Sequence, residues 1–311
     1  MYIFNNKFDL KDRDQLDPYF TDFEYMASGM SFSSLYMWRD INNFSYEIIG
    51  DYLCIAGTDN LEPGLDRHFL VAPLTRTGSY ESKSLRATIE AARDQFQSKG
   101  AECYLMLVPE HLKEVISAAF ADEIEWAYDR DNSDYVYHKM DLIELKGRAF
   151  HKKKNHLNYF LNNYPEYEYV TLTSDMQHLA NDFIREFNER KDLQDPHERM
   201  LLDMEEEAMR DVFGKIEDIG LLAGAILIDG KIQALSLGGR IGEYSVVCHV
   251  EKANIEYRGL YQLINREWCR HLPEEIRLVN REEDMGLPGL RKAKTSYQPC
   301  CMVDKYTALI K

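Results

Sequence analysis

The sequence has no apolar run long enough to cross a membrane. Its longest, from Leu221 to Ile228, has eight residues, whereas a transmembrane helix needs about 20. The first residues also reach Asp9 without the apolar segment of a secretory signal. These absences predict a protein that has no membrane span and stays in the cytoplasm.

Cysteine is scarce, and its spacing does not suit metal binding. No two of the cysteines stand at the Cys-x-x-Cys spacing of a zinc site, and His151 and His156 are not at the i, i+4 spacing that turns two ligands to one side of a helix. We therefore expect no metal and buried, reduced thiols, as in the cytoplasm. The six cysteines are Cys54, Cys103, Cys248, Cys269, Cys300 and Cys301.

Positive charge is also in short supply. With 37 Lys and Arg against 53 Asp and Glu, the formal net charge is -16, which repels polyanions at long range and argues against a general nucleic-acid binder. Two segments run against this balance. Lys146 to Pro165 contains five basic residues and no acid, and the segment from Met285 to the end has one acid, Asp304, against Arg291, Lys292, Lys294, Lys305 and Lys311.

The length and the order of elements predict two domains. The 311 residues exceed the roughly 100 to 200 of one typical domain, and we place the division at 1–145 and 146–311. In the first half, hydrophobic periodicity predicts helices, three short strands, a helix, a strand, a helix and terminal strands. The predicted segments are 9–20, 32–40, 44–49, 52–56, 68–72, 82–99, 103–108, a helix opened by Pro109, 124–128 and 135–141.

The second half repeats this order. It begins with a basic helix over 148–163, and Asp229-Gly230 lies between two apolar strands, which is a strong signal for a hairpin. An amphipathic helix over 259–271 follows the third strand of this meander. The other predicted segments are strands at 167–172, 219–228, 231–239, 244–252, 276–280 and 302–310, and helices at 178–191, 199–213 and 288–293.

Two motifs in the second half carry a resemblance to known families. The segment Tyr257-Arg258-Gly259-Leu260-Tyr261-Gln262-Leu263 lies where GNAT N-acyltransferases keep a pyrophosphate-binding turn, at a helix N-terminus. Tyr261 and Leu263 stand where that family has small residues. The run from Gly286 to Pro299, with Lys294-x-x-Tyr297, resembles the C-terminal domain of phosphatidylglycerol lysyltransferases, which is related to Fem-type aminoacyltransferases and to uncharacterised bacterial proteins.

The resemblance covers essentially the whole chain and implies its fold and donor. It implies an α+β protein of two tandem GNAT-like acyl-CoA N-acyltransferase folds, each a mostly antiparallel mixed sheet flanked by helices. The first half would be a degenerate copy, and the second would carry the donor site. The donor would be a coenzyme A thioester or, alternatively, an aminoacyl-tRNA. The membrane-embedded part of full-length lysyltransferases has no counterpart in this sequence.

Three residues are candidates for catalysis. An amine that attacks a thioester or ester must lose a proton, and we expect Val247, His249 and Glu251 to share one face of a strand, where His249 and Glu251 offer a base. Tyr297, like Tyr261, could protonate the leaving group. Each has a structural alternative: a buried, satisfied histidine, a solvated strand end, or a tyrosine that only packs.

The candidate donor-binding residues lie around the predicted turn and the C-terminal helix. Asn280, at the end of a strand, would hold an amide of the donor or else cap the following turn. The cations would bind phosphate of coenzyme A, tRNA or a lipid headgroup, or form a solvated face. This set comprises Arg258, Gly259, Leu260, Tyr261, Asn280, Arg291, Lys292 and Lys294.

These features support three hypotheses. The first is an enzyme that transfers an acyl or aminoacyl group from a small-molecule donor to an amine or hydroxyl acceptor. The second is a non-catalytic ligand-binding or sensor protein on the same fold. The third is a tRNA binder in which Lys152, Lys153 and Lys154 contact the acceptor stem. The cationic segments also allow peripheral contact with a membrane.

Overall fold

A computed structural model describes residues 1–59, 67–121, 123–190 and 196–311 of the chain. The first half begins with short helical turns and continues with a strand meander. Its elements are β1 (Asn6–Lys7), η1 (Leu10–Asp12), α1 (Arg13–Leu16), α2 (Pro18–Thr21), α3 (Phe32–Met37), β2 (Ser45–Ile49), β3 (Tyr52–Asp59), β4 (Arg67–Leu70), α4 (Ser82–Ser98), β5 (Cys103–Pro109), α5 (Glu110–Ala119) and β6 (Ala127–His138).

The second half repeats the meander with longer strands. Its helices are α6 (Lys139–Glu144), η2 (Arg148–Phe150), α7 (His151–Asn163), η3 (Ser174–Met176), α8 (Gln177–Glu189), α9 (Pro196–Phe213), α10 (Ile216–Ile219), α11 (Leu260–His271) and α12 (Pro288–Thr295). Its strands are β7 (Glu168–Thr171), β8 (Leu222–Ile228), β9 (Lys231–Arg240), β10 (Ser245–Ala253), β11 (Leu278–Asn280) and β12 (Cys301–Ile310).

Local sequence explains many of these elements. Helix α4 buries the apolar stripe that contains Leu85, Ile89 and Phe96, and the side chain of Glu81 caps its N-terminus. In the hairpin between β8 and β9, Asp229 and Gly230 both have positive φ, at 52° and 73°, as a two-residue turn of this type requires. The predicted hairpin is therefore confirmed.

All strands of the described residues join one twelve-stranded sheet, in the order β1-β2-β3-β4-β5-β12-β6-β11-β10-β9-β8-β7. Pairing is antiparallel except at β4–β5 and β10–β11. Each parallel pair follows a three-strand meander and a crossover helix, α4 in the first half and α11 in the second. This repetition confirms the predicted fold class, a mixed sheet flanked by helices in two GNAT-like halves.

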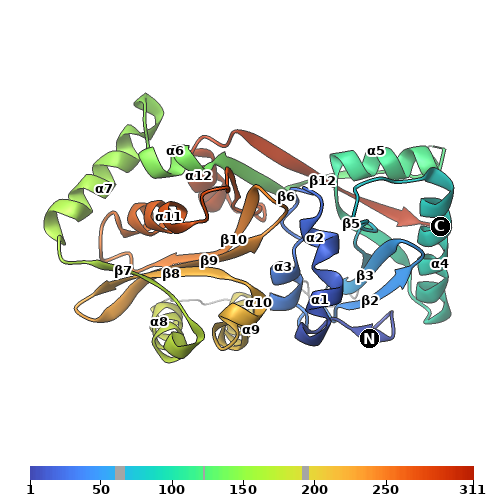
Figure 1. Cartoon of the computed structure of the whole chain (residues 1–311), viewed down its shortest axis with the longest axis horizontal. Helices are drawn as coiled ribbons and strands as arrows, with labels where there is room; N and C mark the ends of the chain where they lie inside the picture. The colour runs from blue at the N-terminus through green and yellow to red at the C-terminus, as the bar shows by residue number, and fades with distance from the viewer. Residues whose placement is uncertain (60–66, 122, 191–195) are drawn as a thin grey trace.

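The two halves exchange their last strands. Strand β12, from the end of the chain, lies between β5 and β6 of the first half. Strand β6 in turn pairs with β11 of the second half. Figure 1 shows the long red arrow of β12 running from the second half into the first. Each half is thus completed by a strand of the other, and the division at residue 145 stays a prediction.

Two apolar cores support this sheet. One is continuous across both halves and includes Leu53 and Phe96 as well as Phe183 and Phe213. The other lies beneath α6, α7 and α11 and contains residues such as Trp268. Because burying one large apolar side chain contributes about 1.5–3 kcal/mol, the shared core stabilises the contact between the halves as well as each half.

The structure corrects three segments of the sequence prediction. The expected strands 124–128 and 135–141 are one strand, β6, and the chain then turns into α6, which was not predicted. The ladder with β12 is irregular at the polar middle of β6: Asp134 pairs with Val303 and Asp129 with Lys305, so residues 130–133 lie opposite Asp304 alone. The expected helix 9–20 is broken into η1, α1 and α2. Lys191, the predicted end of a helix, lies outside the described residues.

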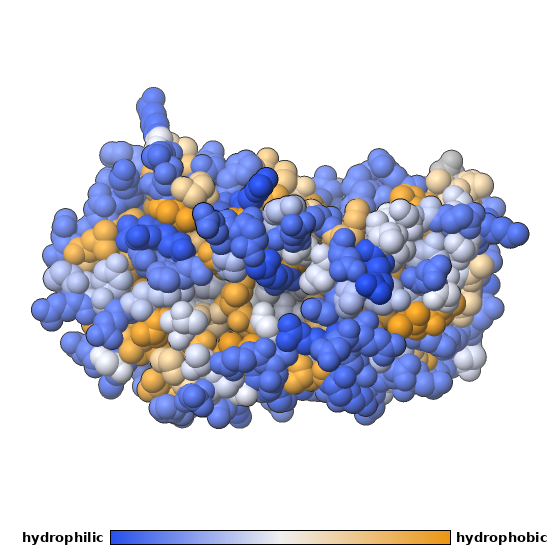
Figure 2. All heavy atoms as spheres, in the orientation of Figure 1, coloured by the Kyte–Doolittle hydropathy of each residue, from blue (hydrophilic) through white to orange (hydrophobic). Residues whose placement is uncertain are grey.

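The surface is largely polar in the view of Figure 2, where apolar residues form small, separate patches. Within the described part of the chain, no helix combines the length and the apolar character that crossing a bilayer requires.

Candidate active site

A bulge in β10 gives His249 its position. Cys248 pairs with Gly238 on β9 and Val250 pairs with Leu237, so His249 is an extra residue in the ladder. A bulge re-aims side chains and interrupts their alternation. Cys248 accordingly belongs to the core beneath α11, whereas Val250, two residues later, belongs to the core that is shared by the two halves.

The expectation that Val247, His249 and Glu251 share one face is therefore wrong, because the bulge lies between them. His249 contacts Ser33 on α3, and Glu251 accepts a hydrogen bond from Asn265 on α11. The two residues predicted as candidates for the base thus belong to two different polar clusters.

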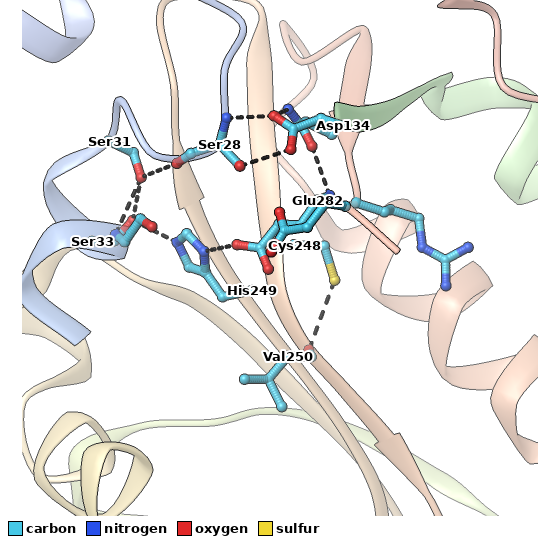
Figure 3. A network of polar contacts seen from close by, with 12 residues as sticks. Ser28, Ser31, Ser33, Asp134, Cys248, His249, Val250 and Glu282 are labelled. Atoms are coloured by element: carbon cyan, nitrogen blue, oxygen red, sulfur yellow. Dashed lines mark hydrogen bonds and ion pairs between the residues drawn. The ribbon is translucent and has the colours of Figure 1, made fainter. Parts of the chain in front are cut away.

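The first cluster centres on a buried histidine whose two ring nitrogens are both engaged. His249 Nε2 lies 2.8 Å from Ser33 Oγ, and His249 Nδ1 lies 2.9 Å from Glu282 Oε1. The His249 side chain is 1% exposed and that of Glu282 is 20% exposed. Figure 3 shows the three side chains in line, with Ser33 contributed by the first half and the other two by the second.

Glu282, two residues after the end of β11, has an unusual backbone conformation. Glu282 has a φ of 59°, a region that non-glycine residues seldom occupy outside functional or tightly constrained sites. Its backbone N–H donates to Asn280 Oδ1 at 2.7 Å. Asn280 Nδ2 donates to Met26 O and to Asp134 Oδ2. Asn280 thus caps the turn that presents Glu282 to His249, and all its polar atoms are used within the protein.

A buried ion pair lies beside this turn. Lys305 Nζ on β12 donates to Asp134 Oδ1 on β6 at 2.6 Å and to Ser28 Oγ at 3.0 Å. Asp134 also accepts from Ser28 N and Ser28 Oγ. Burial lowers the pKa of Lys305, but the carboxylates of Asp134 and Glu283 more than offset this and hold it above its usual value. The exchanged strands are therefore joined by a buried ion pair.

The second cluster lies where β10 and β11 part. Their pairing ends at Val247 and Asn280, and beyond this point Arg281 donates to Glu251 Oε1 at 2.7 Å. Asn265 Nδ2 donates to Glu251 Oε2 at 2.8 Å. Among the described residues, Arg281 Nη1 and Asn265 Oδ1 are buried atoms without a hydrogen-bond partner. One spare donor and one spare acceptor suit a polar ligand such as an amide or ester.

Aromatic rings and a lysine complete this second cluster. The Arg281 guanidinium lies 4.8 Å from the centroid of the Tyr297 ring and 5.6 Å from that of Tyr137. Lys153 on α7 lies 3.7 Å from the Tyr297 ring centroid and donates to Ser296 Oγ at 2.6 Å. Burial, aided by the positive charge of Arg281, lowers the pKa of Lys153 to about 8.

We expect Lys153 to show this low pKa in its chemical reactivity. Its amine should be half deprotonated near pH 8, so the rate at which acetic anhydride acetylates it should level off above that pH. The measurement is peptide mass spectrometry after brief acetylation at a series of pH values. The exposed neighbours Lys152 and Lys154 serve as internal controls. A Lys153 profile that runs parallel to theirs would contradict the prediction.

The predicted phosphate turn precedes α11 and is closely packed. Gly259 has a φ of 95°, and a Cβ at this position would lie 2.1 Å from His156 O on α7. Leu260 is fully buried, and Tyr261 is half-buried. Arg258 is exposed, 4.7 Å from the centroid of the Tyr159 ring. Helix α7 therefore lies directly against the turn, which only glycine permits.

The predicted cations of α12 differ in what they contact. Arg291 pairs with Asp284 and Asp131, and its hydrogen bonds to Asp284 hold the pKa of that carboxyl well below its usual range. Lys294 Nζ donates to the backbone carbonyls of Arg281 and Glu283. Lys292 is exposed. Arg291 and Lys294 thus hold the chain between β11 and α12.

The structure brings together residues that the sequence did not single out. Ser33, Glu282 and Arg281 each contact a predicted site residue, and Lys153 was predicted only as part of a basic helix. The cluster of serines at 28, 31, 33 and 34 was the one local feature of the sequence that could have pointed to Ser33. In the described ranges, no group of three or more His, Cys, Asp or Glu side chains is arranged to hold a metal ion.

The chain matches a known protein family and an uncharacterised relative. The family model for "Phosphatidylglycerol lysyltransferase, C-terminal" matches residues 20–309. An uncharacterised protein of Mycoplasmoides gallisepticum is 25% identical over 198 residues, which cover 59% of this chain and 61% of that protein. This match therefore spans about three fifths of that relative's length.

Solved structures share the fold. A protein of unknown function from Bacteroides thetaiotaomicron is 29% identical, with a TM-score of 0.88 over 98% of this chain and 99% of the other. The C-terminal domain of a putative lysylphosphatidylglycerol synthetase from Agrobacterium fabrum has a TM-score of 0.59 at 12% identity, covering 89% and 87%. L-PGS from Bacillus licheniformis gives 0.56 at 13% identity, covering 86% and 83%. The last two show the likeness of fold alone.

Proposed function

The chain belongs to the family of phosphatidylglycerol lysyltransferase C-terminal domains, and from this premise we propose that it transfers an aminoacyl group from aminoacyl-tRNA to an amine or hydroxyl acceptor. Family and fold point to a transferase. The proposal depends chiefly on the polar cluster where β10 and β11 part, because its buried Arg281 Nη1 and Asn265 Oδ1 have no hydrogen-bond partner in the part of the chain that the structure describes. A carbonyl and an amine of the donor would satisfy these two atoms.

The packing of the turn at α11 favours tRNA over coenzyme A as donor. A pyrophosphate needs open access to the backbone N–H groups of such a turn, and α7 lies directly against Gly259. Helix α7 also presents exposed Lys152 and Lys154, which suit the phosphates of an acceptor stem. Coenzyme A thioester remains the second candidate donor, because a GNAT-like half commonly implies one.

The two clusters would have different roles in the reaction, one in binding the donor and the other in proton transfer. Arg281 and Asn265 would orient the acyl group of the donor, with Tyr297 packed beside them. His249, held by Glu282, would accept the proton that is lost when the acceptor is acylated. Because Ser33 comes from the first half and His249 from the second, the acceptor would bind where the halves meet.

Binding of tRNA should depend on salt in a way that reports the α7 lysines. The Lys152→Ala/Lys154→Ala variant should weaken binding of aminoacyl-tRNA, because each lysine that pairs with a phosphate releases a counterion. Its slope of log affinity against log salt should be shallower by about 1 for each such lysine that is replaced. Fluorescence anisotropy at several salt concentrations measures this slope.

A matched pair elsewhere provides the control. Lys11 and Lys83 are exposed residues of the first half, so Lys11→Ala/Lys83→Ala removes the same charge and should leave the slope near that of the unmodified chain. Equal slopes in the two double variants would show that α7 does not hold the tRNA. If neither aminoacyl-tRNA nor coenzyme A bound, the proposed transfer would be wrong. Phosphatidylglycerol vesicles and soluble amines, tested separately, distinguish a lipid acceptor from a small one.

A further inference from the structure

The contacts of His249 limit what it can deprotonate. Both ring nitrogens are hydrogen-bonded, Nε2 to Ser33 and Nδ1 to Glu282, and the ring is almost completely buried. With the Nδ1 proton directed at the Glu282 carboxylate, Nε2 is left as an acceptor, and the group that it faces is the Ser33 hydroxyl. A substrate amine could reach the ring only by displacing Ser33.

We infer that Ser33 is a nucleophile, activated by His249 and Glu282, that accepts the acyl group as a covalent ester. A hydroxyl, an imidazole and a carboxylate in this order, with separations of 2.8 Å and 2.9 Å, form the arrangement by which a histidine raises the reactivity of a serine and a carboxylate orients the histidine. The inference extends the proposed transfer and depends on it only for the identities of donor and acceptor.

Three features of the fold hold this arrangement. The bulge in β10 directs His249 toward α3. The left-handed backbone of Glu282 places its carboxylate at Nδ1. Gly239 on β9 leaves room for the hydroxyl, since a Cβ there would lie 2.0 Å from Ser33 Oγ. The first two are departures from regular strand geometry, and such departures concentrate at functional sites.

The covalent step balances in atoms and charge. Ser33 Oγ attacks the carbonyl carbon of the donor while its proton passes to His249 Nε2. The bond from that carbon to the leaving oxygen or sulfur breaks, and His249 returns the proton to the leaving group. An acceptor amine or hydroxyl then attacks the Ser33 ester and gives its proton to His249, and the proton finally returns to Ser33 Oγ.

Two small electrophiles test the nucleophile without a natural donor. A small alkyl fluorophosphonate should add once per chain, with loss of fluoride, and peptide mass spectrometry should place the adduct on Ser33. Acetylation by p-nitrophenyl acetate should mark the same residue. Ser33→Ala should lose both adducts, and His249→Gln should slow labelling by about 10³-fold or more. Ser33→Cys, which keeps a nucleophile, should accept the acetyl group as a thioester.

The neighbouring serine is the matched control. Ser34→Ala should label at the unmodified rate, because the backbone N–H of residue 34, not its hydroxyl, is the group that Ser31 caps. Failure of both electrophiles to label Ser33 would overturn the inference, as would labelling that persists in Ser33→Ala. Aminoacyl transfer at full rate by Ser33→Ala would refute the covalent step alone, whereas labelled Ser33 with no transfer to any acceptor would refute only the proposed function.

Discussion

Replacing His249 by glutamine is expected to lower the rate of aminoacyl transfer by about 10²- to 10⁴-fold, the usual contribution of a positioned proton acceptor. Glutamine fills much of the space and can still form hydrogen bonds to Ser33 and Glu282. It cannot accept and hold a proton at neutral pH, so the chemical step should slow while the fold is kept. The measurement is kcat/KM for transfer, with circular dichroism as a check on folding.

A variant of another histidine tests whether the loss of transfer rate is specific to His249. His271, at the end of α11, stacks on Tyr169 with ring centroids 4.0 Å apart, and His271→Gln should leave the transfer rate unchanged. Glu282→Gln keeps the shape of the carboxylate but removes its charge, so it should also slow transfer. If His249→Gln transferred at the rate of the unmodified chain, His249 would be only a packing residue.

Replacing Lys305 by methionine is expected to destabilise the folded chain by about 3–5 kcal/mol, because it leaves a buried charge uncompensated. The Lys305 side chain is 2% exposed and that of Asp134 is 0% exposed. Methionine has a similar length and no charge, so packing is largely kept while Asp134 loses its cation. Urea unfolding, followed by fluorescence, measures the change in the free energy of unfolding.

The reciprocal change tests the cause. Adding Asp134→Asn to Lys305→Met removes the unpaired charge and retains an amide that can still accept from Ser28, so it should recover a substantial part of the stability. The two atoms of the pair are 2.6 Å apart, so we expect the effects of the two substitutions on stability to be coupled. If the two destabilisations simply added in the double variant, the residues would not be coupled.

Most helices and strands of this chain could be predicted from local sequence. The apolar stripe of α4, the Asp229-Gly230 turn and the glycine before α11 each act over a few residues, and the structure has them at the expected places. Strand β6 could not be predicted in this way. Its central residues, such as Arg130 and Asn132, do not alternate between polar and apolar, and the parts of the strand on either side of them pair with β12, more than 160 positions along the chain.

The candidate site was predicted only in part. His249, Glu251, Tyr297 and Asn280 all lie in or beside the two polar clusters. Ser33, however, is 216 residues from His249 in the sequence, and nothing near it indicates a histidine partner. Arg291 and Lys294 were candidates for phosphate binding, with a solvated cationic face as the alternative, but carboxylates and backbone carbonyls of the protein already contact them.

By itself, the sequence determined most of the elements, the hairpin, the absence of a long apolar run and the family resemblance, since periodicity, turn residues and motifs are all local. Only the tertiary structure decided that the halves exchange strands, that a bulge turns His249 away from Glu251, and that Ser33 meets it from the other half. These features depend on which distant segments become neighbours. Buried charges and hydrogen-bonding groups must be paired, and in this fold their partners come from segments far away in the chain.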